Sequence, residues 1–229
     1  MIKKWYKRIF NILYTLYVWS HREVISSKSF YFHFKVSISK GSFFRVSGSK
    51  IYNTRIYILG INNEITSTKA FLEDCQILII GENNKILIKD GVKLRKAQIN
   101  LRGSNCSIII GEKTTFGQVR IVNVGKNNDI IIGDGCLFAD NIEIWASDTH
   151  SIYDKDGNFI NPERPIYIGN NVWIGSYVKI LKGVTIGNNA IIGMNSVVTK
   201  NIENSTLCAG TPLRVLKTDV SWSLDYKTK

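Results

Sequence analysis

The chain is poor in proline and histidine, and none of its cysteines lies in a Cys-x-x-Cys pair. Three prolines and the lack of a low-complexity tract indicate a folded chain without a disordered linker. Three histidines and four scattered cysteines do not form the clustered pattern of a zinc site. We therefore expect no metal. We also expect reduced, mostly buried thiols, since disulfide frameworks belong to small secreted chains.

Several motifs of catalysis and nucleotide binding are also missing. The sequence has no Gly-x-Gly-x-x-Gly fingerprint, no P-loop and no signature of a nucleophilic serine or cysteine. These absences argue against dinucleotide binding, P-loop chemistry and a covalent acyl-enzyme.

The positive charge of the chain is concentrated near its start. Residues 1–55 hold eleven basic residues and one acid, a net charge of +10, whereas the remaining 174 residues hold nineteen basic and seventeen acidic residues, a net of +2. Such an excess can serve nucleic acid, an anionic membrane or an acidic glycan. Because it overlaps an aromatic-rich segment, it favours a membrane surface, and we expect no nucleic-acid partner.

Residues 1–19 carry apolar side chains at helical spacing, with cations mostly on the other side. This composition is typical of an amphipathic helix at a bilayer interface. A helix that packs on the end of the domain is an alternative. A cleaved signal peptide is another, but no small-x-small cleavage site follows. A spanning helix would need roughly 20 apolar residues. We assign residues 1–30 to this basic segment and expect residues 1–20 to contact the inner face of the membrane.

A repeat occupies the middle of the chain. Each unit begins with a Gly-x-Asn turn, and the turns are flanked by short runs rich in isoleucine. Glycine and asparagine suit tight corners with positive φ, and isoleucine suits strands. Short strands between corners at a fixed period predict a β-solenoid. The four units start at Gly60, Gly81, Gly103 and Gly125.

The period tightens to six residues after Ile168. The first residue of six successive hexads is isoleucine or valine, and the fifth is small or β-branched. Three such faces give a triangular coil of 18 residues in which Ile174 stacks on Ile192. This pattern resembles the hexapeptide repeat of the left-handed β-helix acyltransferases. The resemblance implies an all-β, left-handed parallel β-helix over residues 31–217, followed by a tail at 218–229.

His150 is the one histidine of the repeat region, and it follows a predicted strand at residues 142–145. It begins a polar loop, residues 148–166, that interrupts the repeat. Loops on a rigid scaffold often form functional sites. Imidazole has a pKa near neutrality and can both accept and release a proton. His150 is therefore a candidate general base, with a structural or surface histidine as the alternative.

The stretch from Ser147 to Lys217 resembles the bacterial polysaccharide O-acetyltransferases, particularly those that act on capsular sialic acid. The resemblance rests on the Asp-x-His-x-Ile-Tyr loop at 148–153, Asn-Val-Trp-Ile-Gly at 171–175, Ile-Leu-Lys-Gly-Val at 180–184 and Ala-Gly-Thr-Pro-Leu-Arg-Val-Leu-Lys at 209–217. Galactoside and maltose acetyltransferases share the last three in looser form. Residues 1–55 have no counterpart in it.

This resemblance implies direct transfer of acetyl from acetyl-CoA to a sugar hydroxyl, with His150 as general base. Asp148 would orient the imidazole or bind the acceptor, unless it is a solvated loop acid. Trp173 would line the site, unless it serves trimer packing. Acetyl-CoA would lie in a groove between two subunits. The implied donor-binding residues are Gly175, Ser176, Gly193, Met194, Thr199, Lys200, Arg214 and Lys217. The candidate acceptor-binding residues are Asp154, Lys155 and Asn161, plus Asn123 or Arg120.

The resemblance also implies a homotrimer, a carbohydrate acceptor and a cytoplasmic location, with possible peripheral contact at the inner membrane. Two other functions fit the sequence. One is acetylation of a small acceptor such as an antibiotic, serine or a nucleotide sugar, and the other is a silent hexapeptide scaffold that binds a membrane or a partner.

Overall fold

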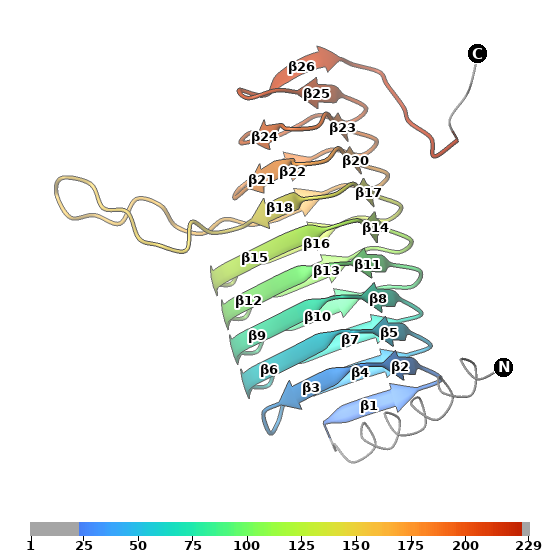
Figure 1. The fold of residues 1–229 in the computed structure, drawn as a ribbon. Helices are drawn as coiled ribbons and strands as arrows, with labels where there is room; N and C mark the ends of the chain where they lie inside the picture. The colour runs from blue at the N-terminus through green and yellow to red at the C-terminus, as the bar shows by residue number, and fades with distance from the viewer. Residues whose placement is uncertain (1–22, 226–229) are drawn as a thin grey trace.

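The repeats form a triangular parallel β-helix in the computed structural model, which describes residues 23–225 (Figure 1). Each turn contributes one strand to each of three sheets, here named A, B and C. Over the described range the secondary structure is β-strand, with no helix. The predicted all-β parallel β-helix is confirmed. The predicted amphipathic helix of residues 1–19 lies outside the described residues, and the first strand already begins at Val24.

Sheets A and C hold eight strands each, all parallel. Sheet A consists of β1 (Val24–Ser27), β4 (Phe43–Ser47), β7 (Glu64–Thr68), β10 (Lys85–Ile88), β13 (Ser107–Ile110), β16 (Asp129–Ile132), β19 (Ile166–Ile168) and β22 (Thr185–Ile186). Sheet C consists of β3 (Lys35–Ile38), β6 (Arg55–Ile61), β9 (Gln76–Glu82), β12 (Gln98–Ser104), β15 (Val119–Lys126), β18 (Ile142–Trp145), β21 (Lys179–Leu181) and β24 (Val197–Val198).

Sheet B has ten strands, because two further strands close the C-terminal end. The last of them, β26, runs antiparallel to its neighbour. Sheet B consists of β2 (Phe30–Phe32), β5 (Lys50–Tyr52), β8 (Phe71–Glu73), β11 (Lys93–Arg95), β14 (Thr115–Phe116), β17 (Leu137–Phe138), β20 (Trp173–Ile174), β23 (Ile191–Ile192), β25 (Leu207–Ala209) and β26 (Arg214–Lys217).

The core is a set of aliphatic ladders inside the prism. Inward-pointing side chains stack turn on turn, and Ile174 pairs with Ile192 in register as the hexads predict. All six first-position residues, from Ile168 to Val198, are buried. Near the N-terminal end the turns are longer, since Ile86 pairs with Ile108. Burial of these side chains from water stabilises the coil.

The Gly-x-Asn turns form a column at the edge that follows sheet C. Gly81 pairs with Gly60 on one side and with Gly103 on the other. Inside this corner, Asn84 donates from Nδ2 to Asn63 Oδ1 at 3.0 Å and to the Gly103 carbonyl at 2.8 Å. Its own Oδ1 accepts the N–H of Cys106 at 3.0 Å. These asparagines are buried and bind the backbone of successive turns together.

The four cysteines are free and buried. Burial raises the pKa of Cys75 and of Cys136 to about 11. Both thiols are therefore protonated at neutral pH, which makes them poor nucleophiles.

Candidate active site

The polar loop after β18 leaves the prism as a protruding hairpin (Figure 1). Tyr153 and Phe159 pair across it in antiparallel fashion. At its turn the Asp154 Oδ1 atom accepts the N–H groups of Asp156 and Asn158, each at 2.9 Å. Hydrogen bonds from Asn158 and these N–H groups lower the pKa of Asp154. Asp154 and Lys155, expected to bind an acceptor, thus lie at the hairpin turn, where Asp154 holds the turn itself.

The base of the hairpin is tied to sheet C by a charged cluster. Lys182 donates from Nζ to Asp148 Oδ2 at 2.5 Å and to the Asn161 carbonyl at 2.9 Å. Asn161 donates from Nδ2 to Asp148 Oδ2 at 2.8 Å and to the His150 carbonyl at 2.9 Å. Asp148 and Asn161 therefore hold the backbone around His150. No hydrogen bond joins Asp148 to the imidazole in the described part of the chain.

The pKa of Asp148 lies below its usual range, mainly because of the hydrogen bond from Lys182 and also because of Asn161. Because the pKa of Asp148 is lower in the folded than in the unfolded state, the Asp148 carboxylate stabilises the fold at pH values above its unfolded pKa. This stabilisation is lost as the pH falls through the folded-state value.

Lys182→Ala is expected to loosen the hairpin, because it removes both bonds of a side chain that is only 12% exposed. Hydrogen exchange of the Ile152 amide, which donates to Asn161 Oδ1, should accelerate roughly 5-fold or more. The difference should become smaller in acid as Asp148 is protonated, because only the bond to the Asn161 carbonyl then remains to be lost. Lys179→Ala is the matched control, since Lys179, three residues earlier on β21, pairs instead with Glu143 on the neighbouring strand β18. Equal exchange in both variants would contradict this role of Lys182.

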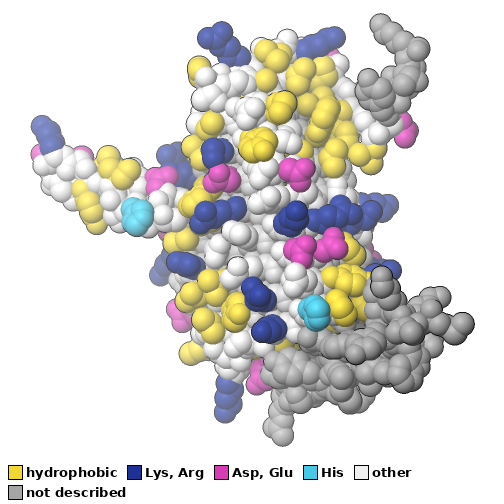
Figure 2. Space-filling view, viewed as in Figure 1, with side chains coloured by type: hydrophobic (Ala, Val, Ile, Leu, Met, Phe, Trp, Pro, Cys, Tyr) yellow, Lys and Arg dark blue, Asp and Glu magenta, His cyan; other side chains and the backbone are white. Residues whose placement is uncertain are grey.

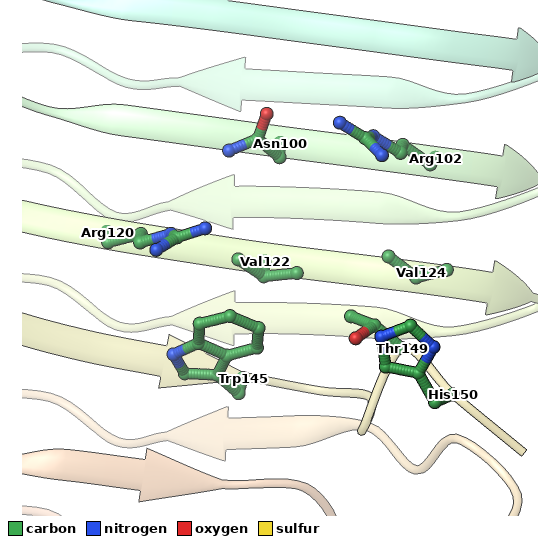
Figure 3. Close-up of a pocket in the computed structure, with 8 residues that line it drawn as sticks. All are labelled: Asn100, Arg102, Arg120, Val122, Val124, Trp145, Thr149 and His150. Atoms are coloured by element: carbon green, nitrogen blue, oxygen red, sulfur yellow. The ribbon is translucent and has the colours of Figure 1, made fainter.

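His150 lies at one end of a pocket of about 340 Å³ on the outer face of sheet C (Figure 3). The floor comes from outward-facing positions of three neighbouring strands, and the hairpin closes one end. Asn100, Val122 and Trp145 are aligned in register on β12, β15 and β18. The pocket is lined by Asn100, Arg102, Arg120, Val122, Val124, Trp145, Thr149 and His150.

The pocket is positively charged. The Arg120 guanidinium lies over the Trp145 ring, 4.9 Å from its centroid. The indole Nε1 of Trp145 donates to Glu143 Oε2 at 2.9 Å, and Glu143 also binds Lys179. The Glu143 carboxylate, which lies beside Arg120, is thus bonded to Trp145 and Lys179. Within residues 23–225, neither Arg102 nor Arg120 has an ion-pair partner.

Two of the expected donor-binding pairs stack at the corner between sheets B and C. Gly175 and Ser176 lie one turn before Gly193 and Met194 on this corner. The backbone carbonyl of Ser176 accepts the N–H of Asn195 at 2.9 Å. A Cβ atom on Gly175 would lie 2.7 Å from the Met194 nitrogen, so the two turns approach closely there. The Met194 side chain is 61% exposed. This corner presents backbone and the exposed side chains of Met194 and Tyr177 to solvent.

The other expected residues are spread over the upper turns. Thr199 and Lys200 lie at the corner after β24, and Arg214 and Lys217 are exposed on β26. Trp173 lies on the outer face of sheet B rather than at a corner, 6.0 Å from the ring of Trp222. It does not line the pocket of His150. One protomer therefore places His150 and the donor-binding corner on different parts of the prism.

The structure places Asn123 inside the prism and not in an acceptor site. Asn123 was a candidate for acceptor binding, but its side chain is fully buried and donates to the carbonyls of Ser107 and Asn128. Strand parity explains the error: Ile121 points inward, so Asn123 two residues later does too. Arg120, the alternative, points outward into the pocket.

Asn100, Arg102 and Trp145 line the pocket but were not predicted from the sequence. The 22-residue period could have predicted that Asn100 and Val122 are neighbours, since they are 22 residues apart and in register. Within residues 23–225, no group of three or more His, Cys, Asp or Glu side chains is placed to hold a metal ion. The same range has no helix long and apolar enough to cross a membrane.

Comparison with known proteins defines the class. Residues 165–200 match the family model for bacterial transferase hexapeptide repeats. The crystal structure of the polysialic acid-specific acetyltransferase NeuO superposes with a TM-score of 0.71 at 25% identity, covering 91% of this chain and 93% of the other. That of the polysialic acid O-acetyltransferase OatWY gives 0.70 at 29% identity, covering 89% and 93%. Fold and repeat together define a hexapeptide-repeat transferase.

Curated relatives narrow the class. A polysialic acid O-acetyltransferase of Neisseria meningitidis is 34% identical over 146 residues, which cover 54% of this chain and 68% of that protein. The chain belongs to the same family of hexapeptide-repeat O-acetyltransferases. A polysialic acid O-acetyltransferase of Escherichia coli O1:K1 is 38% identical over 95 residues, and the galactoside O-acetyltransferase of E. coli K12 is 44% identical over 83. The matches cover 41% and 35% of this chain, but only 31% and 40% of these two relatives.

Proposed function

We propose that this protein transfers an acetyl group from acetyl-CoA to a sugar hydroxyl of a bacterial surface polysaccharide, with His150 as general base. The observation that carries the proposal is the place of His150. It lies at one end of an open pocket on the outer face of sheet C, which two arginines and a tryptophan also line, rather than in the aliphatic core. The relatives that act on polysialic acid support a capsular glycan as acceptor.

The chemistry requires one proton carrier. Neutral imidazole takes the proton of the sugar hydroxyl as its oxygen attacks the thioester carbonyl carbon. The carbon–sulfur bond then breaks, and the imidazolium returns the proton to the sulfur, so that free CoA and an acetyl ester leave. No acyl-enzyme forms, which agrees with the protonated, buried state of the cysteines. Holding acceptor and thioester together supplies much of the remaining acceleration.

The proposal includes a homotrimer. His150 and the corner of Ser176 and Met194 lie apart on one protomer, so a complete site needs the corner of a neighbouring copy. The hairpin fits such a contact, because it projects from the prism with four half-exposed apolar side chains. They are Ile152, Tyr153, Phe159 and Ile160. Exposed apolar surface of this kind is typical of interfaces.

Acetyl-CoA would lie along the corner of Gly175, Ser176 and Met194, where close backbone approach leaves N–H and carbonyl groups for the pantetheine arm. Arg214 and Lys217, both exposed on β26, would meet the CoA phosphates. A cytoplasmic location beside the inner membrane would bring the enzyme to nascent glycans.

Calorimetric titration with acetyl-CoA tests the donor. The native protein should bind, and Ser176→Tyr should block the corner. Arg214→Ala should weaken binding roughly 10- to 100-fold, since one charge-assisted contact is lost. Lys155→Ala, at the hairpin turn, is the control and should bind normally. A well-folded oligomer that does not bind acetyl-CoA would refute the proposed donor and favour a silent scaffold.

A small acceptor is the second candidate, and the similarity to galactoside O-acetyltransferase favours it. A preference for a monosaccharide over its polymer in the transfer assay would establish it.

A further inference from the structure

We propose that Arg102 and Arg120 are specificity-determining residues that bind two separate acidic groups of the acceptor. The acceptor would then be an anionic glycan chain lying across sheet C, with the reacting hydroxyl at the His150 end. The inference rests on the proposed function, because it names the acceptor class of the same pocket.

The first observation is that neither guanidinium group forms an ion pair within the described residues, although Glu143 lies opposite Arg120 in register and Arg120 contributes to its lowered pKa. Five ion pairs join described residues, and none includes Arg102 or Arg120. By contrast, Arg45 pairs with Glu64, and Arg95 lies beside Glu73. The planar fork of arginine matches a carboxylate or phosphate with two parallel hydrogen bonds. Two unpaired arginines in one pocket therefore indicate anionic ligands.

The second observation is the spacing of the two arginines. Arg102 is in register with Val124, which lies four residues beyond Arg120 on β15. At about 3.3 Å per residue, the two backbone positions are separated by roughly 13 Å along the strand direction. This distance exceeds one sugar ring. Figure 3 shows the two side chains extending toward each other from opposite ends of the pocket, so the guanidinium groups lie closer together than the backbone positions. We expect this arrangement to bind acidic groups on neighbouring residues of a glycan chain better than a single acidic sugar.

The third observation is the surface between them. Figure 3 shows Arg120 above Trp145 at one end and Arg102 above Thr149 and His150 at the other, with Asn100 and Val122 between. An indole face packs against the apolar side of a sugar, and an amide hydrogen-bonds its hydroxyls. Arg102 and His150 lie toward the same end of the pocket with Val124 between them, so the part of the chain bound by Arg102 would be the part nearer the base.

The fourth observation is the distribution of charge along the solenoid. Residues 23–126 hold sixteen basic and seven acidic residues, a net of +9, whereas residues 127–225 hold seven basic and eleven acidic, a net of −4. Figure 2 shows a band of Lys and Arg across the middle of the molecule. β12 and β15 lie in the basic part, so the surrounding field also attracts a polyanion.

The test compares charged and neutral forms of the same oligosaccharide. Tetramers of sialic acid and of glucuronic acid, each with its carboxyl-reduced counterpart, are titrated onto the native protein, Arg102→Gln, Arg120→Gln and Arg55→Gln. Arg55 is the matched control, because it occupies the register column of Arg120 three strands away on the same face. A phosphodiester-linked glycan distinguishes phosphate from carboxylate as the recognised group.

We expect the native protein to bind at least one charged glycan more tightly than the reduced tetramers. Each pocket variant should lose roughly 10-fold in affinity for the charged form, with little change for the reduced form. In the transfer assay both variants should raise the KM for the acceptor and leave the KM for acetyl-CoA unchanged. Arg55→Gln should behave as the native protein.

Equal binding of charged and reduced forms, or equal losses in all three variants, would overturn the inference. Transfer to neutral glycans alone would overturn it while leaving the acetyltransferase proposal intact. Arginine-dependent binding of a charged glycan without acetyl transfer would have the opposite meaning: the acceptor site stands and the proposed reaction fails.

Discussion

Replacing His150 by alanine is expected to lower kcat for acetyl transfer by about 10²- to 10⁴-fold, the usual contribution of a general base. The loss falls on kcat because the imidazole acts when the hydroxyl attacks, whereas acetyl-CoA binds at another corner. Its Kd, measured by calorimetry, should therefore change little. The His150 carbonyl accepts a hydrogen bond from Asn161, and alanine retains this backbone contact.

His150→Gln sharpens the experiment, because glutamine keeps a polar side chain of similar reach but cannot carry the proton at neutral pH. It should be about as inactive as alanine. Thr149→Ala removes a side chain that lines the same pocket without titrating, and it should retain far more activity. Near-native kcat in both His150 variants would rule out His150 as the base.

Gly103→Ala should destabilise the fold by about 3 kcal/mol or more. Gly103 has φ of +142°, and an added Cβ atom would lie 1.8 Å from the Gly125 carbonyl oxygen. Backbone of the next turn cannot move aside as a flexible side chain would, so the clash adds to the strain of the φ angle. The midpoint of urea unfolding, at fixed protein concentration, measures the loss.

Gly135→Ala separates these two causes. Gly135 also has positive φ, at +66°, but no atom lies within 4 Å of an added Cβ. Its substitution should cost only about 1–2 kcal/mol, the strain of the left-handed conformation. Equal losses in the two variants would mean that close stacking of the glycine column contributes nothing to stability.

Much of the fold follows from local pattern. The hexads after Ile168 specify which side chain points inward, and Ile174 stacks on Ile192 as expected. Gly81 and Gly103 were recognised as corners because glycine tolerates positive φ, and the structure gives them φ of +127° and +142°. These features follow from a residue pattern that repeats with every turn, so they can be predicted from a single sequence.

The candidate site was harder to predict because it is assembled across turns. Arg102, Arg120 and Trp145 come from three successive strands, and their meeting depends on a register of 22 or 23 residues that no short motif displays. Asp148 was expected to orient the imidazole or bind the acceptor, but its partner is Lys182, 34 residues later. The pairing of Asp148 with Lys182 depends on where the chain returns to the β-helix after the hairpin, and the sequence does not show this position.

The proposed activity is the transfer of acetyl from acetyl-CoA to an acceptor sugar. The most direct measurement incubates the native oligomer with acetyl-CoA and an acidic oligosaccharide, and follows free thiol release together with the mass of the sugar. We expect one acetyl ester for each thiol released, and with His150→Ala both products should form at no more than about 1% of the native rate. Thiol release without an ester on any sugar, or ester formation at a near-native rate in His150→Ala, would contradict the proposed reaction.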